Sequence, residues 1–318
     1  MLAVLVAWLS NQWLIVSREW PGVTALFSGE VQSQSLMQLG IYAVCLAVII
    51  LYVLSSRNKP LRTDAALITR FNTWFIRGCF WAVVFVGLTD MAISFLRVEG
   101  LLHHFFSEDM VKELGRSQFR GSMIHMPLIG AGFVLALVTR TIGFHWLALL
   151  IVVAELAIVI TRFIFSYEQA FMGDLVRFWY AALFLFASAY TLLHEGHVRV
   201  DVFYHALTRR SKGRVNAVGA VLLGMSLCWT IILIGFKGKS SIIYGPMANF
   251  EVSQSGFGMY TKYLMAAFLG VFAISMLIQF VSQLFDAYAD MKDNAPEVEE
   301  AVDTNYVATP AADLNQAG

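Results

Sequence analysis

The chain has 318 residues and a formal net charge of zero. Hydrophobic residues make up 58% of it and charged residues only 14%, whereas soluble proteins have about 25% charged residues. This composition indicates an integral membrane protein and offers no basic domain that could bind nucleic acid. The three cysteines fall in apolar runs, where an unpaired cysteine behaves as a small hydrophobic residue, so we expect no disulfide framework.

Apolar runs long enough to cross a bilayer follow one another along the chain. About 20 such residues span a hydrocarbon core ~30 Å thick, and no alternating pattern favours a β-barrel. The sequence predicts an all-α, polytopic helical bundle of about seven transmembrane helices with a short interfacial amphipathic helix. The predicted spans are approximately Leu36–Leu54, Trp74–Phe95, Ser122–Val138, Phe144–Ile164, Leu175–Leu193, Val218–Phe236 and Tyr260–Leu284. An eighth stretch, Met1–Val16, is short and partly polar; it could span the membrane, lie at its surface or pack on another subunit.

The loop charges predict one orientation in the membrane. The loop Ser55–Asn72 has four cations and one acid, and His194–Arg214 has five cations and two acids, so both are predicted to be cytoplasmic. The loop Arg97–Gly121 balances its charges, which suits the opposite side. The C-terminus is then cytoplasmic, and residues 289–318 have the acidic, weakly apolar composition of a disordered tail.

Two acidic residues lie within predicted spans. Glu155 is about eleven residues into its span and therefore near the bilayer centre, where a charge costs about 2.5–3.5 kcal/mol. We expect it to face other helices, to be protonated or to meet a partner. Asp90 is nearer the outer end of its span, could reach the interface, and is expected to be structural. An alternative function follows from this pair: a stand-alone ion- or proton-coupled transporter or channel that uses Glu155 and Asp90.

The histidines could instead hold haem in a membrane redox subunit, which is a weaker alternative. None of them lies mid-span, as a membrane-embedded bis-histidine haem requires, and His103, His104, His125 and His145 are expected in loops or near membrane surfaces. The chain has no HExxH, CxxC, GxSxG or phosphate-binding glycine loop. The sequence therefore indicates neither an enzyme nor a bound cofactor or metal.

The segment that follows the fifth span, GHVRVDVFYHAL, is predicted to form a two-turn interfacial helix. Its position between two spans and the order His197, Arg199, Val200, Asp201 resemble the small permease, or DctQ-type, subunit of TRAP transporters.

Two neighbouring features strengthen this resemblance. Arg162, followed by Phe163, resembles the Arg-aromatic pair that ends the family's first helix. Asp174 and Arg177 resemble the acidic residue and the arginine that open its second helix. The chain departs from the family pattern in having a single acid, Asp174, where an acidic pair is common, and the resemblance assigns no role to Glu155.

The resemblance implies a domain organisation and a function. Residues 143–288 would form the four-helix small permease domain, and residues 1–142 would add a membrane extension of three or four helices. The chain would be the scaffold subunit of a tripartite, sodium-coupled secondary transporter, with an organic acid as the usual substrate class. Its partners would be a large permease subunit of the DctM type, an extracytoplasmic substrate-binding protein and membrane lipids. It would lie in a bacterial inner membrane.

Overall fold

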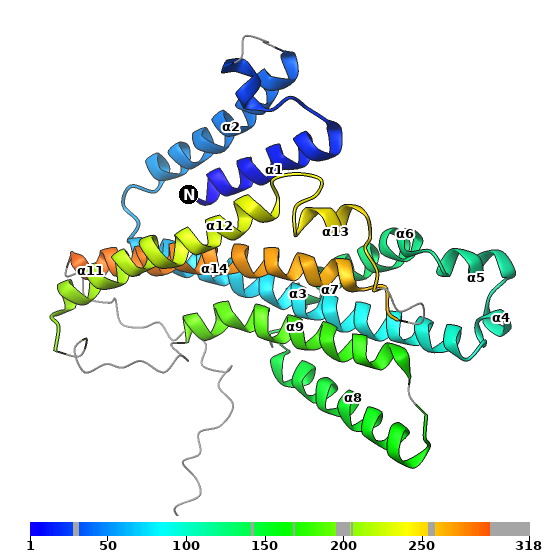
Figure 1. The fold of residues 1–318 in the computed structure, drawn as a ribbon. Helices are drawn as coiled ribbons and strands as arrows, with labels where there is room; N and C mark the ends of the chain where they lie inside the picture. Colours follow the sequence, from blue (N-terminus) through cyan, green and yellow to red (C-terminus); the bar gives the residue numbers. More distant parts are fainter. Residues whose placement is uncertain are drawn as a thin grey trace, which may run out of the picture.

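A computed structural model of the chain describes residues 1–27, 32–140, 143–167, 169–194, 204, 206–253 and 258–292. Helices make up most of the described part (Figure 1), and seven of them are long and apolar enough to cross a membrane. The predicted polytopic helical bundle is therefore confirmed. These seven are α2 (Ser33–Ser55), α3 (Leu61–Val98), the continuous Ser117–Val138, α8 (Phe144–Ile164), α9 (Ala170–Leu193), the continuous Arg209–Gly235, and α14 (Lys262–Met291).

Two of the long helices contain a π-helical turn. The first consists of α6 (Ser117–Phe119), the π-turn η2 (Arg120–His125) and α7 (Met126–Val138). The second consists of α11 (Arg209–Gly219), the π-turn η3 (Ala220–Met225) and α12 (Ser226–Gly235). Shorter elements complete the described chain: α1 (Leu2–Arg18), η1 (Val23–Phe27), α4 (Leu102–Phe105), α5 (Glu108–Leu114) and α13 (Tyr244–Ala248).

α3 is longer than its apolar run, because it begins at Leu61 rather than near Trp74. Its 38 residues measure about 57 Å. The additional turns pack against the end of α14 through polar contacts: Arg62 and Asp290 form an ion pair at 2.8 Å, and the Ser282 hydroxyl donates to the Ala65 carbonyl at 2.8 Å. Polar pairing between two helices thus extends both beyond the predicted spans.

The main hydrophobic core lies between α3, α8, α9 and α14. Aromatic rings fill its centre: Phe186 of α9 meets both Phe80 of α3 and Phe268 of α14 edge to face, with ring centroids 5.5 and 4.9 Å apart. This edge-to-face geometry is the favoured one for aromatic pairs. α14 is therefore central, with α3 and α9 packed on it (Figure 1).

A second core joins α1, α12 and α14. Leu5 of α1 is buried against Met225 and Ile232, and Trp8 meets Trp229 edge to face at 6.5 Å. The stretch left open by the sequence thus forms a 17-residue helix that packs on its own chain. α2 packs mainly on α1 and η1, so this pair lies at one side of the bundle (Figure 1).

α3 and α7 approach closely because glycine lines their contact. A Cβ atom added at Gly132 would lie 2.5 Å from the Ala82 backbone nitrogen and 3.1 Å from the Gly78 carbonyl oxygen. Small residues of this kind let transmembrane helices pack backbone to backbone.

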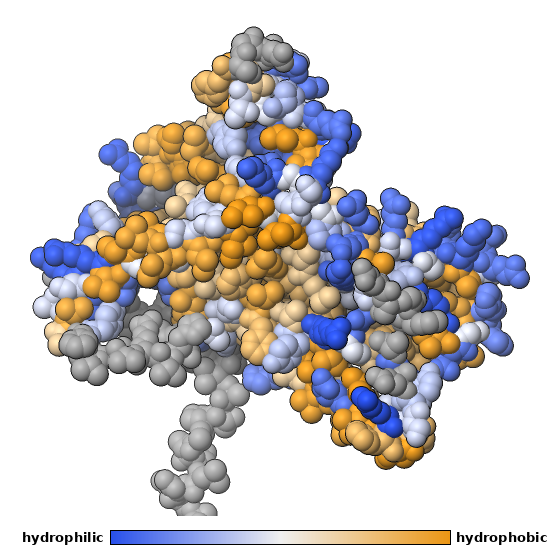
Figure 2. Space-filling model, in the orientation of Figure 1, coloured by the Kyte–Doolittle hydropathy of each residue, from blue (hydrophilic) through white to orange (hydrophobic). Residues whose placement is uncertain are grey.

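The outer surface is divided by hydropathy as expected for a membrane protein. Figure 2 shows apolar side chains along α8 and α12, and hydrophilic ones over α4 to α6 and at α11. The apolar surface is thus flanked by polar ends.

Candidate functional site

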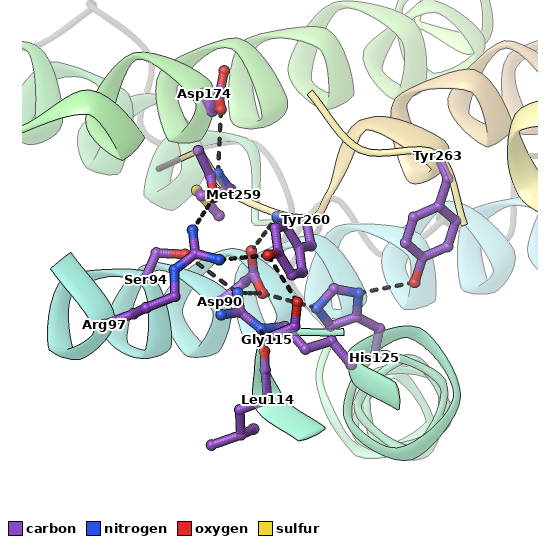
Figure 3. A network of polar contacts seen from close by, with 12 residues as sticks. Asp90, Ser94, Arg97, Leu114, Gly115, His125, Asp174, Met259, Tyr260 and Tyr263 are labelled. Carbon is purple, nitrogen blue, oxygen red and sulfur yellow. Dashed lines mark hydrogen bonds and ion pairs between the residues drawn. The ribbon is translucent and has the colours of Figure 1, made fainter. Parts of the chain in front are cut away.

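A cluster of charged and aromatic side chains lies where the end of α3 meets η2 and the start of α14 (Figure 3). The name "buried cluster" here denotes Asp90, Ser94, Arg97, Arg120, His125, Tyr260 and Tyr263. Its charged members come from the first 142 residues, whereas both tyrosines come from the C-terminal part. The cluster therefore joins the two halves of the chain.

Asp90 is the centre of the buried cluster. Its Oδ1 accepts hydrogen bonds from Arg120 Nη1 at 2.9 Å and from His125 Nε2 at 3.2 Å, and its Oδ2 accepts the backbone N–H of Tyr260 at 2.8 Å. The side chains of Asp90, Arg120 and His125 have no exposed surface. A buried carboxylate is stable only when it is paired and hydrogen-bonded, and both oxygens of Asp90 meet that condition.

The π-turn η2 explains how Arg120 and His125 reach the same carboxylate. In an α-helix, residues five apart point roughly 140° away from each other. In a π-helix the backbone hydrogen bonds join residues five apart, so such residues return to the same side. Pro127, the second residue of α7, lacks the N–H that a regular helix would use. The π-turn thereby aims one cation and one imidazole at Asp90.

His125 is hydrogen-bonded through both of its ring nitrogens. Nε2 lies 3.2 Å from Asp90 Oδ1, and Nδ1 lies 2.8 Å from the Tyr263 hydroxyl. The His125 and Tyr263 rings are stacked with centroids 5.9 Å apart. His125 thus connects Asp90 of α3 to Tyr263 of α14.

Tyr260 is held by two arginines. The guanidinium carbons of Arg120 and Arg97 lie 4.2 and 4.8 Å from its ring centroid, within cation–π range. Arg97 Nη1 donates to the Tyr260 hydroxyl at 2.5 Å, and that hydroxyl donates to the Gly115 carbonyl at 3.0 Å. Arg120 Nε also donates to the Leu114 carbonyl at 2.6 Å. These bonds attach the loop between α3 and α7 to the start of α14.

A second carboxylate holds the residue next to Tyr260. Oδ2 of Asp174, near the start of α9, accepts the backbone N–H of Met259 at 3.2 Å (Figure 3). Arg177 lies 3.8 Å from Asp174 and is largely exposed. Asp90 and Asp174 therefore bind successive N–H groups just before α14, where the partial positive charge of a helix N-terminus favours acids. One acid comes from each half of the chain.

The buried cluster is suited to anchoring rather than to ion binding or catalysis. The Asp90 oxygens are occupied by Arg120, His125 and Tyr260. Among the described residues, no group of three or more histidine, cysteine or acidic side chains is arranged to hold a metal ion. What the geometry does is fix three segments relative to one another: the end of α3, η2 and the start of α14.

The structure differs from the sequence analysis at three of these residues. The sequence predicts Arg120 in an external loop, His125 near a membrane surface and Asp90 within reach of the interface. All three are instead buried, and both Arg120 and His125 are bonded to Asp90. Arg120 and His125 lie 30 and 35 positions from Asp90 along the chain, so no local spacing predicts the contact.

The other predicted residues are distributed differently. Glu155 and Arg162 are exposed on α8. Asp174 and Arg177 form the pair described above. His197, Arg199, Val200 and Asp201 lie outside the described residues. Of the interfacial helix predicted there, only Tyr204, Ala206 and Leu207 are described. Most of the predicted acidic tail also lies outside the described residues.

The structure gives no support to either alternative site. Asp90 is buried between α3, η2 and α14, whereas Glu155 is on the outer surface of α8, so the two acids do not form one ion pathway. Both ring nitrogens of His125 are hydrogen-bonded. The other described histidines, His103, His104, His145 and His194, are exposed.

Comparison with known proteins identifies the C-terminal part. Residues 150–290 match the family described as tripartite ATP-independent periplasmic transporters, DctQ component. No curated protein and no solved structure matches the chain. The resemblance inferred from the sequence is thus confirmed, and the matched region includes all of α9, α11 and α12 and most of α8 and α14.

Proposed function

We propose that this DctQ-type chain is the small membrane subunit of a tripartite, binding-protein-dependent, sodium-coupled transporter, with an organic acid as substrate. The observation that carries the proposal is the family match over residues 150–290. Its partners are a larger permease of the DctM type and an extracytoplasmic substrate-binding protein. The chain lies in a bacterial inner membrane with its C-terminus in the cytoplasm, as the basic loops favour.

The chain acts as a fixed scaffold within this assembly. A moving transport subunit needs a rigid frame with a wide apolar surface, and the buried cluster supports such rigidity by bonding the extension to α14. Apart from the two π-turns, no long helix in the described part of the chain is broken by a non-helical segment of the kind that binds substrate in transporters. Substrate binding is therefore assigned to the partners.

The family-motif residues have structural roles in this proposal. His197, Arg199, Val200 and Asp201 form an interfacial turn between the second and third helices of the DctQ unit, with Arg199 at the lipid headgroups. Asp174 anchors the segment before α14, an assignment supported by its bond to the Met259 N–H. Arg162 and Glu155 belong to the surface that meets another subunit.

Co-purification followed by reconstitution tests the proposal. The tagged full chain, extracted from its native membrane in a mild detergent, should retain a larger polytopic membrane protein in fixed stoichiometry. Reconstituted together, the two should take up substrate only with the binding protein and a sodium gradient.

Transport by this chain alone, without a larger partner, would overturn the scaffold assignment. Uptake that persists without sodium would overturn the coupling while leaving the scaffold role intact. A variant with Arg199→Ala should insert normally but assemble or transport less; a matched control at Arg57, in the first basic loop, should change neither.

A further inference from the structure

Glu155 is an exposed acid at the middle of a transmembrane helix. α8 runs from Phe144 to Ile164, so Glu155 lies about 16 Å from its first residue and about 13 Å from its last. Its side chain is exposed, and it has no hydrogen bond or ion pair with any residue that the structure describes. At the middle of this helix, Glu155 therefore faces the outside of the helical bundle rather than its core.

Lipid alone does not satisfy this position. A glutamate side chain is too short to reach either headgroup layer from the bilayer centre, and a carboxylate in hydrocarbon is energetically unfavourable. Such residues almost always face a protein neighbour or a water-filled cavity and pair with another group. Since α8 is at the outside of this bundle, beside α9 (Figure 1), the described part of this chain offers no such neighbour, and another molecule would supply it.

The surroundings of Glu155 form a surface on one flank of α8. Val152, Val159 and Arg162 are exposed near the same side of the helix as Glu155, because positions three, four and seven apart share a face. This surface, here called the Glu155 flank, carries an acid at mid-membrane and a cation two turns further along. The buried face of α8, with Leu147, Ile151 and Ala154, lies beside this flank and packs inward.

The exposed surface of α2 provides a contrast. Its 18-residue apolar window is only 6% buried, and its exposed side chains at mid-helix are aliphatic, including Val44, Val48 and Leu51. Lipid tails satisfy such a surface completely. Exposure therefore does not by itself indicate a partner, but an exposed mid-helix acid does.

We propose that the Glu155 flank of α8 binds a transmembrane helix of the larger permease subunit, and that this helix presents a cationic or hydrogen-bond-donating side chain at the depth of Glu155. Arg162 meets an acceptor nearer the end of the same contact. The inference rests on the proposed function and specifies which surface of the small subunit makes the contact and what chemistry the partner supplies.

A second copy of this chain fits the flank less well. Two copies in one membrane share their orientation, so a two-fold symmetric contact brings equivalent residues together. Glu155 would then meet Glu155, and Arg162 would meet Arg162. Like charges at an interface are repulsive, whereas a different helix can supply the opposite charge at each level.

Replacement of Glu155 by leucine tests the proposal. Glu155→Leu makes α8 more apolar, so the chain should insert and unfold as the wild type does when it is purified alone. Recovery of the larger subunit with the tagged chain should fall roughly three- to thirtyfold, the range expected for a lost hydrogen bond between transmembrane helices. Val153→Leu, on the exposed face away from the flank, is the matched control and should leave recovery unchanged.

Photo-crosslinking identifies the neighbour directly. A photoreactive amino acid at Val159, on the flank, should crosslink to the larger subunit, whereas one at Val153 should not. Undiminished recovery with Glu155→Leu, or crosslinks at Val159 to lipid or to a second copy only, would overturn the inference. If the wild-type chain recovers no larger permease at all, the proposed function itself fails, so the two failures are distinguishable.

Discussion

Removing the charge of Asp90 should destabilise the bundle more than removing both charges of its pair with Arg120. In Asp90→Asn, Arg120 keeps its charge, has no exposed surface and loses its carboxylate. Breaking a buried ion pair from one side costs about 3–5 kcal/mol. In the double variant Asp90→Asn/Arg120→Met, no uncompensated charge is left, so we expect it to be at least about 2 kcal/mol more stable than the sum of the single effects.

Thermal unfolding of the purified chain in a mild detergent measures this difference. At about 2 °C per kcal/mol for a chain of this size, Asp90→Asn should lower the midpoint by roughly 6–10 °C, and the double variant should recover part of that loss. Asp109→Asn, at an exposed position on α5, is the matched control and should stay within about 0.5 kcal/mol of the wild type. An Asp90→Asn variant as stable as the wild type, or strictly additive single effects, would refute the anchoring role.

Two further predictions concern other contacts. Gly132→Ala should destabilise by about 1–3 kcal/mol because its Cβ would meet the backbone of α3, whereas Gly130→Ala, with nothing within 4 Å, should not; equal unfolding midpoints would contradict the close packing. The exposed pair of Glu19 and Lys239, 2.6 Å apart, predicts a pH window. The hydrogen bond from Lys239 lowers the pKa of Glu19 below 4.5, and the same bond raises the pKa of Lys239 above 10.5. Stability from the pair should be fully present between these values and lost as the pH falls through the lower pKa or rises through the upper one. The difference in unfolding midpoint between wild type and Lys239→Met should therefore be small, salt-sensitive and absent at pH extremes; a difference that persists at low pH would point to another cause.

The sequence predicts the spans well because apolar length is a local property that lipid requires of every helix. The predicted start of α3 was wrong, because the residues from Leu61 onward are stabilised by polar contacts with α14 rather than by lipid. The length of an apolar run does not predict a helical extension that is stabilised by polar contacts with another helix.

The buried cluster could not be predicted from the sequence for a related reason. Arg120 is next to an apolar run and has the same composition signal as a loop cation, yet the π-turn buries it with His125 on Asp90. The partners are distant in the sequence, and a π-turn has no spacing signature of its own. Glu155 was different: its depth could be read from the sequence, and only its direction required the structure.

The central position of α14 has a consequence for biogenesis. α14 is the last helix of the described chain to leave the ribosome, and it contributes Phe268 to the main core and Leu277 to the second core. Neither core is complete until it inserts. The N–H of Tyr260 and the hydroxyl of Tyr263 reach their partners on α3 and η2 at the same moment. The earlier helices therefore lack part of their packing contacts until α14 inserts. A chain that ends before Lys262 would leave both cores incomplete and the ion pair of Asp90 and Arg120 uncovered, and quality-control proteases could recognise it.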